Sequence, residues 1–333
     1  MISQNAKLSP ELFSSDISLK PTRDGFGTGT IEAGKADSNV LVLCADLAES
    51  TRAEWFQKEF PERFIEMGIA EQNMASTAAG FALAGKVPFI ASYAAFSPGR
   101  NYEQIRTTIA LNNVGVKIAG MHAGVSVGPD GATHQMLEDI GLMRMLPNMT
   151  VIVPGDALEA HKAVVLAAKT KGPVYIRFGR SGVPTFTTSD TPFEIGKALV
   201  VWEAGNDAPK PKLTILSTGS MTHMAILSAR ALISEGISVE VVHVPTVKPL
   251  DKETILASVK KTGKVLTIEE HQVAGGFGSA IAEFLCEEYP VRILRMGIQD
   301  EFGQSGEPDE LLSHYGLSTV HITETAKTFV TRG

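Results

Sequence analysis

The chain has 333 residues, of which 44% are hydrophobic and 20% are charged. These are ordinary proportions for a folded globular protein and exclude a disordered or fibrous chain, while the length predicts two domains. Asp and Glu (37) outnumber Lys and Arg (30), for a net charge of −7. This acidic balance argues against nucleic-acid binding, and any anionic ligand would need a local cluster of cations.

The N-terminus is interrupted by Lys7, Glu11 and Asp16 before any apolar run of signal-peptide length, and no run approaches a membrane span. We therefore expect a cytoplasmic protein that does not contact a membrane. The two cysteines, Cys44 and Cys286, lie in apolar contexts without metal-type spacing, and we expect both to be reduced thiols in the core.

Short β-branched apolar runs alternate with segments of helical period, a pattern typical of an α/β fold with open parallel sheets and helices on both faces. The strands expected in the first half are 40–44, 64–66, 87–92, 116–121, 150–153 and 174–177. The helices expected among them are 23–36, 70–84, 102–112, 134–145 and 157–169.

The alternation stops between residues 182 and 212, which are rich in Pro, Thr and Gly and contain one short strand at 198–202. It resumes with strands at 213–217, 239–244, 265–269 and 291–296, and helices at 222–234, 252–261 and 279–288. The sequence predicts two tandem domains at 21–185 and 212–333, an N-terminal extension (1–20) and a linker (186–211). Ligands of such sheets bind where loops leave the carboxyl ends of the strands.

The segment Met67-Gly68-Ile69-Ala70-Glu71-Gln72-Asn73-Met74 follows a short strand and opens an Ala-rich helix. Glu71 is either a first-turn carboxylate stabilised by the helix dipole or a functional group. The second interpretation is favoured by Gly68, which lets the backbone approach a ligand, and by apolar surroundings, which raise a carboxyl pKa. Such a carboxyl could exchange a proton with a bound heterocycle.

Two aromatic residues, Tyr93 and Phe96, lie at the carboxyl end of strand 87–92, before a turn and Arg100. Each ring either packs in the core or forms a platform on which a flat ligand stacks.

The next strand ends in a glycine-rich loop, His122-Ala-Gly-Val-Ser-Val-Gly-Pro-Asp130-Gly-Ala-Thr133-His134-Gln135. Thr133 is expected to cap the helix that follows. Two histidines and an aspartate on one loop suit hydrogen bonds to a polyhydroxylated substrate and proton transfer near neutral pH. A structural loop is the alternative, while the absence of HExxH or a second cluster of metal-type ligands disfavours zinc.

Arginines at strand ends can clamp a phosphate in fork geometry. Arg177 and Arg180 follow one strand and Arg23 begins the first helix, so all three are candidates. The segment Gly276-Phe277-Gly278-Ser279 imitates a dinucleotide fingerprint, but Ile281 occupies the place of its last small residue and the loop is too long, so we reject nicotinamide binding.

Taken together, several ordered motifs resemble the C-terminal half of transketolase over nearly the whole chain. These motifs are ADLAES, GIAEQNM, YAAF, HAGVSVGPDGATHQ, LPNMTVIVPGD, IEEH, GGFGSAIAE and RMGIQDEFGQSG. The resemblance implies the pyrimidine-binding and C-terminal domains of a thiamine-diphosphate enzyme. The domain that grips the diphosphate and metal in that family carries Gly-Asp-Gly and a later Asn, whereas the nearest segment here is Gly155-Asp156-Ala157 without that Asn.

The resemblance therefore implies half of a split transketolase. An N-terminal transketolase subunit would hold Mg²⁺ or Ca²⁺ and the diphosphate, this chain would hold no metal, and the cofactor would bridge the two chains. A dimer of heterodimers is expected. The implied reaction moves a two-carbon ketol unit from a ketose phosphate to an aldose phosphate, with sugar phosphates as substrates.

Site roles follow from the resemblance. Glu71 corresponds to the glutamate that bonds the pyrimidine ring nitrogen and promotes its imino tautomer, Phe96 and Tyr93 to the stacking rings, and Leu47 beside Asp46 to the apolar support of the cofactor. Arg100 is a further cofactor-side candidate, one residue later after Phe96 than in the family. The remaining correspondences are with substrate groups: His122 and Asp130 with donor hydroxyls, His134 with an acid/base near the reacting carbonyl, and Arg23, Ser50 and Arg180 with the sugar-phosphate clamp.

Three alternatives stay open. A deoxyxylulose-phosphate synthase-like enzyme has a similar AEQ motif and Asp-Gly-x-Thr-His-Gln run, and a 2-oxoacid dehydrogenase β-type subunit shares the architecture. A non-catalytic partner subunit is the alternative of another class. His122 and the split chain favour transketolase over the first. The second is disfavoured because the loop from His122 to His134 looks adapted to sugars. The joint presence of Glu71, Phe96, His122, Asp130 and His134 disfavours the third.

Overall fold

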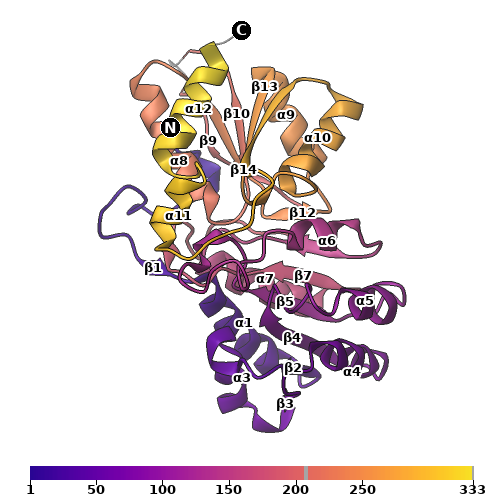
Figure 1. Ribbon diagram of the computed structural model, residues 1–333. Helices are drawn as coiled ribbons and strands as arrows, with labels where there is room; N and C mark the ends of the chain where they lie inside the picture. The colour runs from indigo at the N-terminus through magenta and orange to yellow at the C-terminus, as the bar shows by residue number, and fades with distance from the viewer. Residues whose placement is uncertain (206–208, 332–333) are drawn as a thin grey trace.

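Two largely parallel β-sheets, one above the other in Figure 1, organise the computed structural model, which describes residues 1–205 and 209–331. The first sheet has the order β12-β6-β7-β5-β4-β2-β3. Its strands are β2 (Val40–Cys44), β3 (Phe64–Glu66), β4 (Val87–Tyr93), β5 (Lys117–Met121), β6 (Thr150–Ile152), β7 (Val174–Arg177) and β12 (Thr246–Lys248). All pair in parallel except β12, which runs antiparallel to β6.

The second sheet has the order β14-β13-β10-β11-β9. Its strands are β9 (Leu199–Trp202), β10 (Thr214–Ser217), β11 (Glu240–His243), β13 (Lys264–Gln272) and β14 (Arg292–Ile298). Only the edge strand β9 is antiparallel to its neighbour. A small antiparallel pair, β1 (Leu19–Lys20) with β8 (Val183–Pro184), lies outside both sheets.

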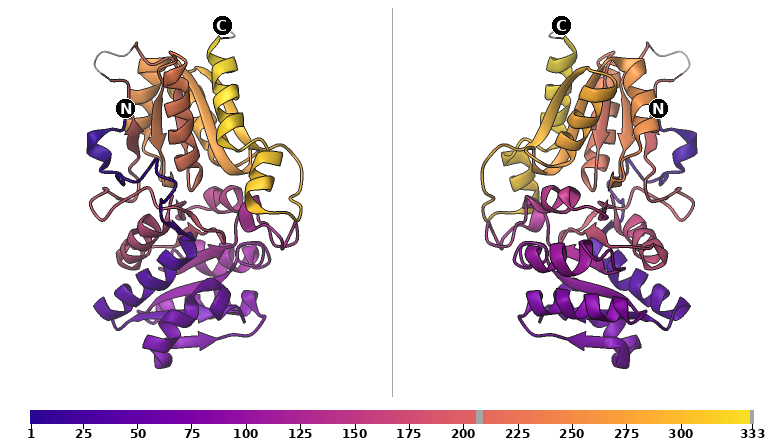
Figure 2. Two further views of the ribbon diagram at one scale, coloured as in Figure 1. Left: turned by 90° about the vertical axis from the view of Figure 1, so that its left-hand side faces the viewer. Right: turned by 90° about the vertical axis from the view of Figure 1, so that its right-hand side faces the viewer.

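Helices cover the sheets on both faces, which confirms the predicted fold class (Figures 1 and 2). The α-helices are α1 (Thr22–Ala36), α2 (Ala48–Thr51), α3 (Ala53–Glu59), α4 (Glu71–Leu83), α5 (Tyr102–Gln104), α6 (Asp139–Met145), α7 (Ala157–Lys169), α8 (Met221–Ser234), α9 (Lys252–Thr262), α10 (Phe277–Glu288), α11 (Pro308–His314) and α12 (Thr319–Thr331). Single turns are η1 (Gln4–Ala6), η2 (Pro61–Arg63), the π-helical η3 (Ile105–Ala110) and η4 (Val125–Val127).

Burial in β2 shows how one strand serves two cores. Every residue of β2 is buried. Val40 and Val42 join a core beneath α1 and α7, whereas Leu41 and Leu43 join a core beneath α4 and η3, because successive side chains of a strand point to opposite faces. The first sheet is therefore buried on both faces, and functional side chains gather at its carboxyl edge.

One apolar core crosses the junction between the sheets. Val151 and Val153, at the end of β6, belong to the same buried cluster as Val244 and Val247 from the second half of the chain. The chain also crosses the junction twice more. Strand β12 joins the first sheet, and the N-terminal segment packs against the second, where the amide of Ser3 donates to Val201 O (3.1 Å). Figure 2 shows this indigo segment beside the upper unit.

Most predicted strands and helices match the structure within a few residues, but one prediction at the functional loop is wrong. We expected a helix over 134–145 capped by Thr133, whereas α6 begins at Asp139. The Thr133 hydroxyl instead contacts Nδ1 of His134 (2.9 Å). The helical periodicity of the sequence does not alone decide where α6 begins, because the 122–135 segment is held by contacts from distant parts of the chain.

Several elements were not predicted: β12, α2, α3, α11 and α12. Of the helices in the part of the chain described, none is both long and apolar enough to cross a membrane.

Candidate functional site

Glu71 is the first residue of α4, directly after a turn in which Gly68 has φ +66°. Its side chain is only 2% exposed. Oε2 accepts a hydrogen bond from Arg100 Nη1 at 2.8 Å, and the Glu71 carbonyl accepts one from Asn101 Nδ2 at 3.0 Å. Asn101, which is fully buried, therefore positions the backbone of Glu71, and the sequence analysis missed it.

Arg100 bridges Glu71 and Phe96. Its guanidinium carbon lies 4.6 Å from the centroid of the Phe96 ring while its Nη1 donates to Glu71. The arginine side chain is 47% exposed, so solvent weakens the ion pair to about 1 kcal/mol or less. The planar guanidinium of Arg100, with its N–H donors, is thus held against the Phe96 ring. Its ion pair with Glu71 requires little free energy to break.

Four rings bring the loops after β4 and β5 together. Tyr93 stacks on Phe96, with centroids 5.8 Å apart, and on His122, with centroids 3.9 Å apart. His134 meets Phe96 edge-on at 5.6 Å and Tyr93 at 5.9 Å. Because the carboxyl ends of parallel strands meet at one edge, residues 122–135, named the 122–135 loop below, lie over the aromatic residues of the preceding strand.

His122 is 1% exposed and has φ +53°, an uncommon conformation for a residue other than glycine. Burial, helped by the positive charge of Arg23, lowers its pKa to about 3. His122 is therefore neutral at pH 7 and suits hydrogen bonding better than the proton transfer expected from the sequence. Within the described residues its Nδ1 has no hydrogen-bond partner.

The predicted cations gather beside His122. Arg23 Nη1 donates to the Ser50 carbonyl (2.7 Å) and lies 3.4 Å from His122 Nε2. Arg180 Nη1 donates to the Val127 carbonyl (3.2 Å), and its Nε is 3.9 Å from a carboxylate oxygen of Asp130. The buried Nε of Arg23 has no partner among the residues described. Guanidinium N–H donors beside His122 are thus left free, at the place where an anion would bind.

Asp46 and Leu47 border the same edge. Asp46 has φ +56°, and its amide donates to Glu66 Oε1 at 2.7 Å, as does the amide of Gly68 at 2.9 Å. Leu47 packs partly buried against the core under α1. Glu66, also missed from the sequence, therefore joins the Asp46–Leu47 loop to the turn before Glu71.

Comparisons with known proteins show the family of the chain. Residues 20–185 match the family model of the transketolase pyrimidine-binding domain, and residues 203–322 match that of the transketolase C-terminal domain. A protein of Methanocaldococcus jannaschii described as a transketolase C-terminal section is 44% identical over 92% of this chain and 95% of its own length. The chain belongs to the transketolase family.

Two further relatives of this transketolase-family chain have a similar extent. The 6-deoxy-6-sulfo-D-fructose transketolase subunit SqwH of Clostridium sp. (strain MSTE9) is 38% identical over 91% of this chain and 92% of its own. A solved structure described as a split gene transketolase, inactive beta4 tetramer, is 43% identical with a TM-score of 0.85, covering 93% of this chain and 98% of that one.

One predicted arginine of this transketolase-family chain is not at the site. Arg177 is buried, where its Nε donates to Asp139 Oδ2 (2.9 Å) and its Nη2 to the Glu270 carbonyl (2.8 Å). The expected phosphate-clamping role is wrong, because the guanidinium is buried and is bonded to Asp139 and to backbone carbonyls. Tyr175 also donates to Asp139 Oδ2 (2.7 Å), which completes a network between the two domains.

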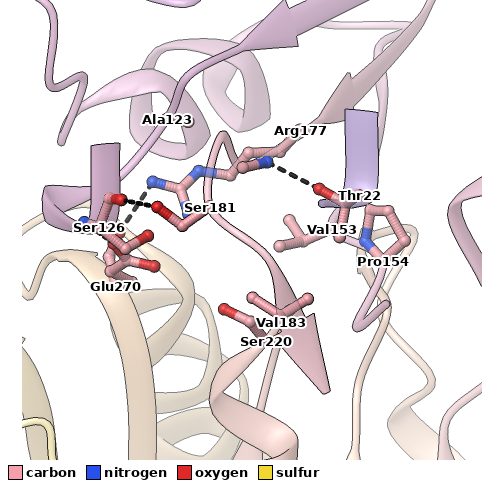
Figure 3. A pocket seen from close by; sticks show the side chains of 12 residues that line it. Thr22, Ala123, Ser126, Val153, Pro154, Arg177, Ser181, Val183, Ser220 and Glu270 are labelled. Carbon is pink, nitrogen blue, oxygen red and sulfur yellow. Dashed lines mark hydrogen bonds between the residues drawn. The ribbon is translucent and has the colours of Figure 1, made fainter. Parts of the chain in front are cut away.

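A small cavity with room for about one water molecule (20 Å³) adjoins this network. Figure 3 shows Ser126, Ser181 and Glu270 on one side of it, with Arg177 above and Thr22 opposite. The cavity adjoins the 122–135 loop, because Ser126 of that loop is one of its lining residues.

The dinucleotide-like segment before α10 has an internal explanation. The carboxylate of Glu269 accepts hydrogen bonds from the amides of Phe277 (2.5 Å) and Gly278 (2.7 Å). Burial raises the pKa of Glu269 to about 8. A carboxyl group from β13 therefore occupies the helix N-terminus where a phosphate would bind.

The cysteine prediction was half wrong. Cys44 is buried and its pKa is raised to about 11 by burial, whereas Cys286 lies exposed on α10. Across the residues that the structure describes, no group of three or more His, Cys, Asp or Glu side chains could hold a metal ion.

Proposed function

We propose that this chain is the C-terminal subunit of a thiamine-diphosphate-dependent transketolase. It would transfer a two-carbon ketol unit from a ketose phosphate to an aldose phosphate, in complex with an N-terminal transketolase subunit. The observation that carries the proposal is the arrangement of Glu71, Arg100 and Phe96. The guanidinium of Arg100 stands where an aminopyrimidine would need to stack on Phe96 and donate to Glu71. The Phe96 ring and the Glu71 carboxylate thus fit an aminopyrimidine ring.

Thiamine diphosphate, when bound, supplies the nucleophilic carbon and the electron sink that carry a two-carbon unit. Glu71 would hold a proton between its carboxyl oxygen and a ring nitrogen, which requires Arg100 to release Oε2. Phe96 and Tyr93 would supply the stacking surface, and Leu47 beside Asp46 the apolar support. Burial of Glu71 keeps water away from this proton.

The substrate roles follow from the remaining geometry. His122, neutral at pH 7, and Asp130 would bond hydroxyl groups of the donor sugar. His134, edge-on to Phe96 and partly buried, would be the acid/base near the reacting carbonyl. Arg23, Ser50 and Arg180 would hold the sugar phosphate, since the two arginines flank His122 and retain donors facing the loop.

The metal and diphosphate would belong to the partner. Family relatives described as a C-terminal section and as a split gene transketolase support a separate N-terminal subunit. Exposed apolar side chains at α4 and the adjacent η3 support a covered surface: Ile69 (74% exposed) precedes α4, Leu83 (72%) ends it, and Leu111 (74%) follows η3. We propose a dimer of heterodimers that holds Mg²⁺ or Ca²⁺ in the partner, in the cytoplasm.

Reconstitution tests the proposal. The chain is purified alone and together with an N-terminal transketolase subunit, and each preparation is given a ketose phosphate and an aldose phosphate. We expect ketol transfer that needs both chains, thiamine diphosphate and Mg²⁺. Condensation of pyruvate with an aldose phosphate would indicate the deoxyxylulose-phosphate synthase reaction instead, and oxidative decarboxylation of a 2-oxoacid would indicate a dehydrogenase β subunit.

A variant distinguishes a catalytic from a non-catalytic subunit. Turnover of the reconstituted pair that is unaffected by Glu71→Ala would support the non-catalytic role. Loss of turnover with an intact complex, measured by size-exclusion chromatography, would support the catalytic one.

A further inference from the structure

The 122–135 loop carries His122, Asp130 and His134 but contains little regular structure of its own, only the single turn η4. The loop has backbone hydrogen bonds of its own, such as that from the Gly131 amide to the Gly128 carbonyl, and side chains from elsewhere add to them. From its own domain, Ser181 Oγ donates to the Ser126 carbonyl (2.6 Å), and Arg180 donates to the Val127 carbonyl (3.2 Å).

The second domain supplies a further contact, from a buried carboxyl group. Glu270, near the end of β13, accepts the amide N–H of Ser126 on its Oε1 at 2.5 Å. A carboxylate acceptor makes a stronger hydrogen bond than a carbonyl does. Close approach is possible because Gly124, with φ +93°, has no side chain where it meets the Glu270 carboxylate. Figure 3 shows Glu270 beside Ser126.

A second set of hydrogen bonds joins the same domain to the end of the loop. Gln135 Nε2 donates to the Gln304 carbonyl (2.9 Å) and to the Val125 carbonyl (3.0 Å). Since Gln135 Nε2 also lies 3.3 Å from the Gly128 carbonyl, Gln135 joins both ends of η4 to the segment after β14. The loop is held between the two domains rather than by the first alone.

Glu270 is itself held firmly. It is 5% exposed, and its carbonyl accepts Arg177 Nη2 at 2.8 Å, while Arg177 is anchored by Asp139. The backbone of this buried residue is thus anchored, and its carboxyl group lies against Gly124 with the Ser126 amide on Oε1, so the acceptor atom is in place before any ligand arrives. Displacement of Ser126 would move a residue only four positions from both His122 and Asp130.

We propose that Glu270 is a positioning residue, through which the second domain fixes the 122–135 loop and sets the places of His122, Asp130 and His134 over Phe96. The kinetic consequence rests on the proposed ketol transfer, whereas the structural consequence does not. This assigns to the second domain a role at the site although Glu270 touches neither cofactor nor sugar.

Hydrogen–deuterium exchange on the full chain tests the structural part. Glu270→Ala removes the acceptor, and Glu270→Gln keeps a neutral one, so we expect exchange in peptides covering 124–128 to rise about tenfold or more in the first and by an intermediate factor in the second. Glu240→Ala is the matched control, since Glu240 is a buried carboxylate of the same domain paired with Lys261. It should leave these peptides unchanged.

Equal loop exchange in wild type and Glu270→Ala would overturn the proposal. So would an equal rise in Glu240→Ala, because the loop would then report only general stability. If Glu270→Ala does not fold, Glu270→Gln decides, and exchange identical to that of the wild type would overturn the proposal.

Steady-state kinetics of the reconstituted complex test the functional part. We expect Glu270→Ala to raise KM for the ketose phosphate about tenfold, while the Kd for thiamine diphosphate, measured by fluorescence quenching, changes by less than about twofold. Unchanged KM together with a loosened loop would overturn the positioning role. An inactive wild-type complex would instead refute the proposed function, and the exchange experiment would still decide whether Glu270 holds the loop.

Discussion

The junction between the domains and the site above it use the same residue types in opposite ways. Arg177, the last residue of β7, is buried and bonded to Asp139 and to a carbonyl, whereas Arg180, three residues later, is partly exposed with Asp130 at 3.9 Å. Two arginines that look equivalent in the sequence are thus a scaffold residue and, in the proposed function, a cation for the ligand. The two arginines differ in how completely neighbouring groups accept hydrogen bonds from their guanidinium N–H donors.

The largest effect expected at the site comes from Glu71. Glu71→Gln keeps the size of the side chain but cannot hold the exchangeable proton, so we expect kcat of the reconstituted enzyme to fall by about 100- to 10,000-fold. Unfolding by urea should show a stability close to that of the wild type.

The exposed Glu62 provides the matched control. Glu62→Gln should leave kcat unchanged. A Glu71→Gln enzyme with wild-type turnover would show that this carboxyl belongs with the scaffold residues rather than with the site.

Substitution of the two arginines tests the comparison itself. Arg177→Met leaves Asp139 buried without its ion pair and should lower the free energy of unfolding by about 3–5 kcal/mol. Arg180→Met should change that free energy by less than about 0.5 kcal/mol and raise KM for sugar phosphates about tenfold. Urea unfolding and initial-rate assays measure both, and an exchange of the two phenotypes would contradict the assignment.

The neutral histidine gives a pH prediction. The pKa of His122 is about 3 in the folded chain against an ordinary value of 6.5, so the unfolded chain binds the extra proton between these values. Stability is therefore lost as pH falls from about 6.5 towards 3, by up to about 1.4 kcal/mol per pH unit from this group. His122→Asn should flatten the slope in urea unfolding series at pH 4 to 8.

Part of that slope will remain in His122→Asn. Burial also lowers the pKa of His223 and His271, which add to the same acid limb. A slope unchanged by the substitution would show that His122 titrates normally and is more open to solvent than its packing against Tyr93 indicates.

The smallest effect concerns Arg100. Its ion pair, in which Arg100 is half-exposed and Glu71 buried, competes with a ring nitrogen for Glu71, so Arg100→Leu should tighten the binding of thiamine diphosphate to the complex by about fivefold. Isothermal titration calorimetry measures this Kd. Weaker binding would show that Arg100 is a cofactor ligand, as its place in the sequence first predicted.

Local patterns were sufficient for most of the fold. Strands such as β2 and β7 were predicted with their observed bounds, because continuous apolar runs between polar turns specify buried parallel strands. The start of α6 was not, since residues 134–138 follow helical periodicity but are held by long-range contacts, among them the bond from Gln135 to the Gln304 carbonyl. Strand β12 was missed because three residues joining a distant sheet leave no periodic signal.

The same limit applied to the site. Residues on motifs with glycine and aromatic neighbours, such as Glu71, Phe96 and His134, were found from the sequence, and the structure places them together. Asn101, Glu66 and Glu270 were missed, because each acts through a hydrogen bond to the backbone of a residue far away in the sequence, a contact without a local pattern. The order of residues carries little information about such a contact.

By itself, the sequence determined the two α/β domains, the strand ends at which functional groups gather, and the family. Only the tertiary structure decided which charged groups remain available: it buried Arg177 against Asp139 and left Arg180 at the loop. Hydrophobic periodicity is a local property that the chain order encodes directly. The satisfaction of a buried charge depends on partners dozens of residues away, and only folding brings these within hydrogen-bonding distance.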